Sequence, residues 1–176
     1  MQSSPSRSSC GDSAEPLEIE RKFLIEYPDQ DWLARQPGSR RAEIVQTYLC
    51  SDGSGSRRVR AWTEDGETTY FRAFKRMLTD RTRVEQEDRI TEAEYLALLD
   101  EADPARRPIV KVRWCVPYAS HILEIDLYPF WEDQAVLEVE LQDEEEAFGI
   151  PPELRVLREV TGDPRYLNSS LAREIP

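Results

Sequence analysis

Charged side chains recur at every second position in several segments of this chain, and this pattern restricts the fold more than any other feature. In the first segment, Glu18, Glu20 and Lys22 alternate with apolar residues between Leu17 and Phe23. Successive side chains of a β-strand point to opposite faces, so the three charges would share one face of a strand over about residues 17–26. Two carboxylates at this spacing can converge on one small cation, and the lysine adds a charge that attracts anions.

The alternation returns in later segments, usually with apolar residues between the charged ones. The charged positions are Arg58 and Arg60, Lys75, the run Arg83, Glu85, Glu87 and Arg89, the pair Lys111 and Arg113, the pair Glu124 and Asp126, and the pair Glu138 and Glu140. An ordinary antiparallel sheet with one solvated face has this pattern. A closed barrel with a charged interior has it too, and there the charges are costly unless they form pairs or bind ions. The alternation alone leaves both geometries open.

The remaining signals predict one domain that follows a disordered tail. Residues 1–15 contain six serines and no hydrophobic periodicity, which is typical of disorder. Residues 16–176 are long enough to form a single domain with its own core. Strands are expected over residues 17–26, 42–50, 57–62, 68–77, 82–90, 109–116, 120–128 and 135–142, and short helices over residues 29–36, from the capping box at 91–94, and from residues 163–164. The predicted fold is α+β, with about eight mainly antiparallel strands.

The composition argues against several classes of function. The formal net charge is −12, whereas a general binder of nucleic acids or anionic membranes needs a basic surface. No apolar run approaches the ~20 residues of a transmembrane helix, and the N-terminal segment lacks the apolar core of a signal peptide. Cys10, Cys50 and Cys115 show no metal-binding or redox spacing, so a reducing cytoplasm is the expected location. His121 is the single histidine, so a histidine-based mechanism would depend on one residue.

The residue types in the charged pairs indicate which ligands the site would bind. Pairs of carboxylates supply the oxygen ligands that Mg²⁺ and Mn²⁺ prefer, and nothing in the pattern suits zinc or a redox metal. Arginine and lysine pairs suit phosphate oxygens. The sequence contains no Gly-x-x-x-x-Gly-Lys-Ser/Thr motif, so a nucleotide would not be bound by a P-loop. Carboxylates, a hard metal ion and several cations together indicate metal-dependent handling of a polyphosphate.

In these motifs and their order, the chain resembles the CYTH family, also known as the triphosphate tunnel metalloenzymes. The segment Glu18-x-Glu20-x-Lys22 matches the signature of that family. The pairs that follow in the family's order are Arg58-x-Arg60, Glu85-x-Glu87, Glu124-x-Asp126 and Glu138-x-Glu140. The closing segment, residues 159–172, is similar to the ending of the short bacterial members, and the resemblance covers roughly residues 16–173.

The resemblance implies an eight-stranded antiparallel β-barrel with short flanking helices, whose tunnel holds a triphosphate with one or two Mg²⁺ or Mn²⁺ ions. It implies that the metal-side acids are Glu18, Glu20, Glu87, Asp126, Glu138 and Glu140. The phosphate-binding residues would be Lys22, Arg58, Arg60, Lys75, Arg83, Lys111 and Arg113. Among all of these, Glu18 and Lys75 are the expected catalytic residues, with Glu18 positioning the attacking water.

Two positions depart from the family pattern. Ala73 stands where members commonly have threonine, and Ser56 stands where the vertebrate thiamine triphosphatases have an aromatic residue. The second departure disfavours thiamine triphosphate. The expected reaction is hydrolysis of inorganic triphosphate to pyrophosphate and phosphate, with weaker action on nucleoside triphosphates, by a monomer or homodimer. An adenylate cyclase of the same family and a non-catalytic polyphosphate- or nucleotide-binding module are the alternatives.

Overall fold

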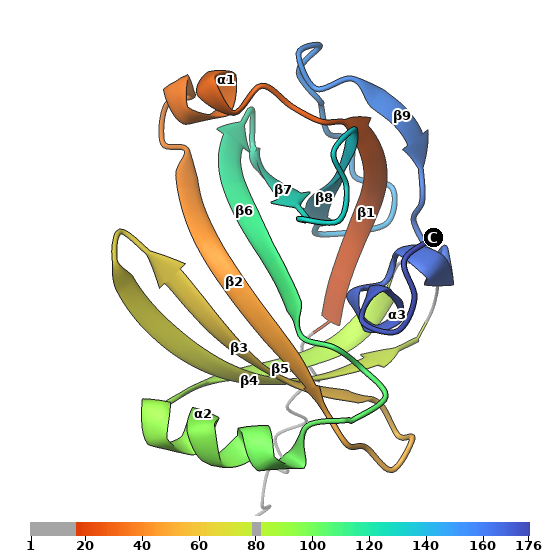
Figure 1. The fold of residues 1–176 in the computed structure, drawn as a ribbon. Coiled ribbons are helices and arrows are strands. Elements are labelled where there is room, and N and C mark those ends of the chain that lie inside the picture. Colours follow the sequence, from red (N-terminus) through yellow and green to blue (C-terminus); the bar gives the residue numbers. More distant parts are fainter. Residues whose placement is uncertain (1–16, 79–81) are drawn as a thin grey trace, which may run out of the picture.

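The computed structural model describes residues 17–78 and 82–176 (Figure 1). The side chains of residues 17, 18, 77, 82 and 83 are not described, although their backbone is assigned to strands. The predicted disordered tail, residues 1–15, lies outside the described residues.

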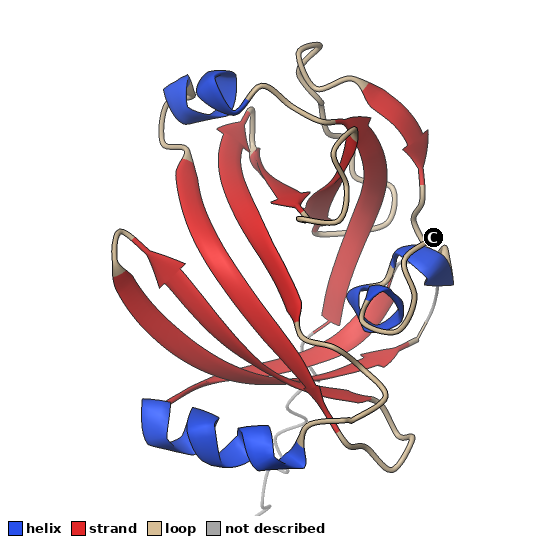
Figure 2. Ribbon diagram, in the orientation of Figure 1, coloured by secondary structure: helices blue, strands red, loops and turns tan. Residues whose placement is uncertain are grey.

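The described chain is built mainly from one antiparallel β-sheet (Figures 1 and 2). Its strands are β1 (Leu17–Glu26), β2 (Arg40–Leu49), β3 (Ser56–Glu64), β4 (Glu67–Met77), β5 (Thr82–Ile90), β6 (Ile109–Tyr118), β7 (His121–Leu127), β8 (Gln134–Leu141) and β9 (Val156–Glu159). They are hydrogen-bonded in the order β5-β4-β3-β2-β6-β7-β8-β1-β9. The described sheet has nine strands rather than eight, because residues 156–159 form a short additional strand beside β1. The prediction of a mainly antiparallel α+β fold is confirmed.

The sheet curls back on itself at β1. One edge of β1 pairs with β8 from Ile19 to Glu26, and its other edge pairs with β9 near its end. That second edge also pairs with β5 over three residues, Leu17 to Ile19, near the start of β1. The strand at one end of the sheet order, β5, is thereby paired with β1 near the other end, and the inward faces of the strands point toward one another.

The helices are short and lie around the curled sheet (Figure 2). They are α1 (Gln30–Arg35), α2 (Glu92–Leu98) and α3 (Asn168–Leu171), with 3₁₀ turns at Leu99–Glu101 and Pro164–Tyr166. The predicted capping box is present, since Thr91 and Glu94 bond to each other's backbone N–H groups. The predicted helix start at Asp163 and Pro164 is a 3₁₀ turn that leads into α3. With seven residues in the longest of them, no helix in the described ranges could span a bilayer.

Apolar side chains pack on the outward face of the curled sheet and, beyond the charged residues, on part of its inward face. On the outward face of β1 and β6–β8, residues such as Phe23, Ile125 and Leu137 form a core that α1 covers with Leu33. On the inward face, Leu24 and Val136 continue β1 and β8 beyond the charged residues and pack with the C-terminal segment. One end of the curled sheet is therefore filled by apolar side chains.

Candidate functional site

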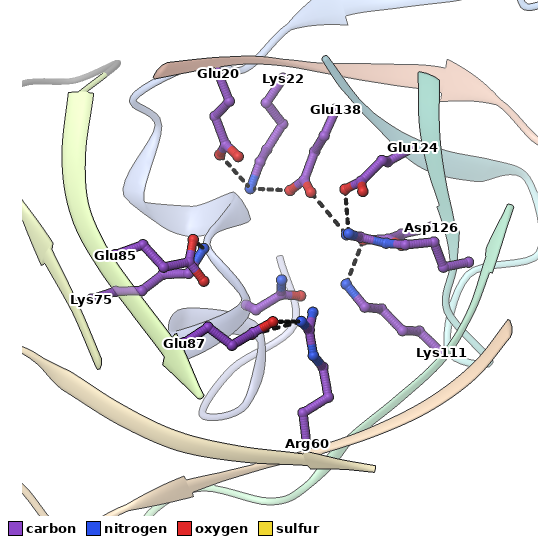
Figure 3. A network of polar contacts seen from close by, with 12 residues as sticks. Glu20, Lys22, Arg60, Lys75, Glu85, Glu87, Lys111, Glu124, Asp126 and Glu138 are labelled. Carbon is purple, nitrogen blue, oxygen red and sulfur yellow. Dashed lines mark hydrogen bonds and ion pairs between the residues drawn. The ribbon is translucent and has the colours of Figure 1, made fainter. Parts of the chain in front are cut away.

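The charged faces of the strands surround a cavity of about 420 Å³ (Figure 3). Its charged lining residues are Glu20, Lys22, Arg58, Arg60, Lys75, Glu85, Glu87, Lys111, Arg113, Glu124, Glu138 and Glu140. Several are largely removed from solvent; Lys22 is 5% exposed and Arg58 is 8% exposed. The charges therefore point into a cavity rather than to bulk solvent as they would on a half-exposed sheet.

Most of the predicted site residues line this cavity. Asp126 lies behind the wall, fully buried, with both carboxylate oxygens bonded to cations of β6. The side chains of Glu18 and Arg83 lie outside the described residues, and their roles stay predictions. The backbones of these two residues are directly paired between β1 and β5.

A buried ion network forms one wall of the cavity, and Figure 3 labels its members Lys111, Glu124, Asp126 and Glu138. Arg113 lies at its centre. The Arg113 guanidinium donates to both oxygens of Asp126, at 2.7 Å each, and to Glu138 at 2.9 Å. It also donates to Glu124. Lys111 Nζ bonds to the same Asp126 carboxylate at 2.5 Å. The register explains this convergence, because Arg113 lies opposite Asp126 in the β6–β7 ladder, and Glu124 lies opposite Glu138 in the β7–β8 ladder.

Burial and neighbouring charges change the proton affinities in this network. Burial, reinforced by the nearby Arg113 charge, lowers the pKa of Lys111 to about 8. Burial alone would raise the pKa of Asp126, but the cations Arg113 and Lys111 outweigh it and hold that pKa below its ordinary value. Loss of hydration raises the pKa of Glu124. The negative charges of Glu138 and Asp126 raise it further, and the positive charge of Arg113 opposes the rise. Burial would likewise raise the pKa of Glu138, but Lys22 and Arg113 hold that pKa well below its ordinary value, so Asp126 and Glu138 are both anions that lie between two cations.

Lys22 links β1 to the acids of β8. Its Nζ lies 2.7 Å from a Glu138 oxygen and 3.7 Å from a Glu20 oxygen. Its backbone is fixed by the C-terminal segment, since Lys22 N donates to Thr161 Oγ1 and Val160 N donates to Lys22 O. The ammonium group is thus held between two acids on the cavity wall.

The opposite wall is formed by cations of β3 and β4 that pair with acids of β5. Arg58 bonds to Glu85 at 3.0 Å, and Lys75 bonds to the other oxygen of Glu85 at 2.5 Å. Arg60 bonds to both oxygens of Glu87 through one nitrogen. The Nε atoms of Arg58 and Arg60 are buried and have no hydrogen-bond partner in the described structure. A buried N–H without a partner is costly, so these two groups favour an additional anionic or polar ligand.

Comparison with known proteins gives a relative over almost the whole chain. An inorganic triphosphatase of Acetivibrio thermocellus is 32% identical over 158 residues, which cover 89% of this chain and 93% of that protein. The chain belongs to the CYTH family. No protein-family model matches it.

Solved structures agree with this assignment to the CYTH family. A crystal structure described as the inorganic triphosphatase NE1496 is 28% identical, covers 90% of this chain and 96% of its own, and superposes with a TM-score of 0.55. The PH1819 protein of Pyrococcus horikoshii OT3 has the same fold at 19% identity, with a TM-score of 0.54 over 72% of this chain and 80% of its own.

The CYTH family implies a divalent metal, and the acids of this cavity fit one in their donor chemistry. Glu20 lies directly opposite Glu140 across β1 and β8, and Glu124 lies opposite Glu138 across β7 and β8. Like charges in such cross-strand positions repel unless a cation lies near them, and here Arg113 lies beside Glu124 and Glu138 while Lys22 lies beside Glu20. Their oxygen donors suit Mg²⁺ or Mn²⁺. In the described residues, however, no three metal-ligating side chains of Asp, Glu, His or Cys form a ready-made site.

Several cavity-lining residues were not predicted as site residues from the sequence, among them Gln46, Tyr48, Asn168 and Ser169. Gln46 and Tyr48 lie on the inward face of β2, directly opposite Arg60 and Arg58, and Gln46 Nε2 donates to the Tyr48 hydroxyl at 2.8 Å. Asn168 and Ser169 come from the start of α3. The spacing of two between Gln46 and Tyr48 could have placed them on an inward face, whereas nothing in the sequence placed α3 at the cavity.

Proposed function

We propose that this protein hydrolyses inorganic triphosphate to pyrophosphate and phosphate in a reaction that requires Mg²⁺ or Mn²⁺, with weaker action on nucleoside triphosphates. The observation that carries the proposal is the gathering of five cationic side chains, Lys22, Arg58, Arg60, Lys75 and Arg113, around one cavity. Arginine side chains bind phosphate oxygens through two parallel hydrogen bonds. Five cations around one cavity suit a chain of phosphates better than a single phosphate.

Two similarities support the choice of reaction. The Acetivibrio thermocellus relative and NE1496 are both named as inorganic triphosphatases, and each matches about nine-tenths of this chain. The acids of the cavity add a second argument, because a protein that only bound polyphosphate would not need so many carboxylates beside it.

The roles of the residues follow from their places in the cavity. Arg58, Arg60 and Lys75 would bind phosphate oxygens from the β3–β4 wall, and Lys22 and Arg113 from the opposite wall, with Lys111 supporting Arg113 through Asp126. Arg83 stays a predicted phosphate-binding residue. Lys75 would also neutralise negative charge on the transferred phosphoryl group, and Glu18 would position the attacking water.

The acids divide between two tasks in this proposal. Glu18, Glu20, Glu138 and Glu140 would hold one or two Mg²⁺ or Mn²⁺ ions, which when bound would neutralise charge on the phosphates. The family resemblance gives Glu87 and Asp126 the same task. The geometry also supports a cation-holding task for these two, since Glu87 pairs with Arg60 and Asp126 pairs with Arg113 and Lys111. Glu138 would combine both tasks, because it pairs with Lys22 and Arg113.

The sheet would act as a closed tunnel. The pairing of β1 with β5 supports closure on one side, and the apolar cluster around Leu24 and Val136 supports a blocked end. Tyr48 is the single aromatic residue among the described residues that line the cavity, and its hydroxyl is bonded to Gln46. Stacking of a nucleotide base would have little support there. Location in a reducing cytoplasm and a monomeric or homodimeric state stay predictions.

A substrate comparison tests the proposal. With Mg²⁺ or Mn²⁺ present, the rates of phosphate release from inorganic triphosphate, ATP and thiamine triphosphate are measured, and cyclic AMP is assayed with ATP. We expect kcat/KM for inorganic triphosphate to exceed that for ATP at least tenfold, a difference of ~1.4 kcal/mol in the barrier. Cyclic AMP formed from ATP as fast as phosphate is released would instead identify a cyclase.

A further inference from the structure

The C-terminal segment supplies part of the cavity wall that the proposed function does not use. Leu167, Asn168 and Ser169 line the cavity. The segment is held on both sides of these residues, because Lys22 Nζ of β1 donates to the Tyr166 carbonyl at 3.4 Å and Arg107 N, in the loop before β6, donates to the Ala172 carbonyl at 2.9 Å. Leu171, fully buried, anchors it in the apolar cluster. The position of these residues at the cavity is therefore fixed by packing.

The orientation of the Asn168 amide is fixed by one buried tyrosine. The Tyr128 hydroxyl donates to Asn168 Oδ1 at 2.6 Å. The Tyr128 ring is itself held, 3% exposed, against Phe130 and Trp131, with ring centres 5.1 and 5.4 Å away. With Oδ1 engaged by Tyr128, the two N–H groups on Nδ2 are left as the free end of the amide. No acceptor in the described chain bonds to them.

A free amide N–H pair in a cation-rich cavity is suited to an acceptor-only ligand. Phosphate oxygens accept hydrogen bonds, and unlike the arginines and lysines around it, Asn168 would donate to them without an acidic partner competing for the same N–H groups. Building on the proposed function, we infer that Asn168 is a further substrate-binding residue that donates to a phosphate oxygen, and that Tyr128 is the positioning residue that orients its amide.

Substitutions at the two positions test this inference. Asn168→Asp keeps an oxygen for Tyr128 but replaces the donor with a negatively charged oxygen, and it should raise KM for inorganic triphosphate at least about tenfold. Tyr128→Phe releases the amide and should raise KM by about threefold, through the loss of one neutral hydrogen bond. Since Tyr128 acts through Asn168, the Tyr128→Phe effect should vanish in an Asn168→Ala background. Equal Tyr128→Phe effects in both backgrounds would overturn the positioning role.

A matched control and a binding measurement separate this inference from the proposed function. Ser170→Asp adds the same charge to the same segment, at a position that is not among the cavity-lining residues, and should leave KM unchanged within about twofold. Binding is followed as the rise in melting temperature that inorganic triphosphate causes in a buffer with chelator, where metal-dependent turnover is absent. We expect a clear rise for the wild-type protein and less than half of it for Asn168→Asp.

The outcomes are distinguishable. If the wild-type protein hydrolyses triphosphate while Asn168→Asp has an unchanged KM and melting shift, the inference is wrong and the proposed function stands. If no hydrolysis occurs in either metal but the melting shift depends on Asn168, the binding role stands and the proposed function is wrong. If triphosphate causes no melting shift in the wild-type protein and is not hydrolysed, both are wrong.

Discussion

Replacing Glu20 with glutamine is expected to abolish turnover of inorganic triphosphate, leaving less than about a tenth of the wild-type rate. Glu20 lines the cavity opposite Glu140, and the substitution removes one negative charge at nearly constant volume. In our account that charge belongs to the metal-binding acids, and its loss should raise the barrier by more than ~1.4 kcal/mol. The measurement is kcat for phosphate release at saturating metal and triphosphate.

Glu26→Gln is the matched control for this experiment. Glu26 lies on the same strand, but its side chain is 46% exposed and pairs with Arg155 outside the cavity. Its substitution should leave kcat unchanged. If Glu20→Gln retains more than a tenth of the wild-type rate, Glu20 is not a primary metal ligand, and the division of the acids proposed above is wrong.

Replacing Arg113 with methionine is expected to lower the free energy of unfolding by about 3–5 kcal/mol, because it leaves the Asp126 charge buried without its main partner. Asp126 is 0% exposed and receives two hydrogen bonds from Arg113. Lys111 alone would remain to neutralise it. The measurement is urea-induced unfolding without substrate or metal, analysed as a two-state transition.

Arg165→Met provides the comparison for an exposed ion pair. Arg165 also bonds to both oxygens of an aspartate, Asp163, but its side chain is 61% exposed. Its loss should cost less than about 1 kcal/mol. Combining Arg113→Met with Asp126→Asn should recover part of the lost stability, since the unpaired buried charge is then removed. A cost below about 1 kcal/mol for Arg113→Met would contradict the buried network.

Local sequence rules predicted most of the secondary structure. The limits of β1 and β5 match the predicted strands at both ends, because charged residues recur at every second position over much of each segment. The β3–β4 hairpin follows from Asp65 and Gly66, which both have positive φ as this tight turn requires. In contrast, β9 was not predicted. Its four residues are all exposed and do not alternate, and it forms because β1 offers an edge from a distant part of the chain.

The candidate site was predictable as a set of residues but not as an arrangement. The alternation predicts which residues share a face of each strand, as it does for the strands of Arg113 and Asp126. It does not predict whether that face points into the sheet's interior. That depends on the pairing of β1 with β5, which joins residues more than sixty positions apart. The partners within the network depend on strand register, and the contribution of Asn168 depends on where the C-terminal segment packs. Both are properties of the folded chain.

Phosphorus NMR of inorganic triphosphate mixed with the wild-type protein tests the central claim most directly. With Mg²⁺ or Mn²⁺ present, we predict that the triphosphate signals are replaced by those of pyrophosphate and phosphate in equal molar amounts, and that excess chelator stops the reaction. Triphosphate that stays intact in both metals, or that is cleaved equally well in chelator, would contradict a metal-dependent triphosphatase.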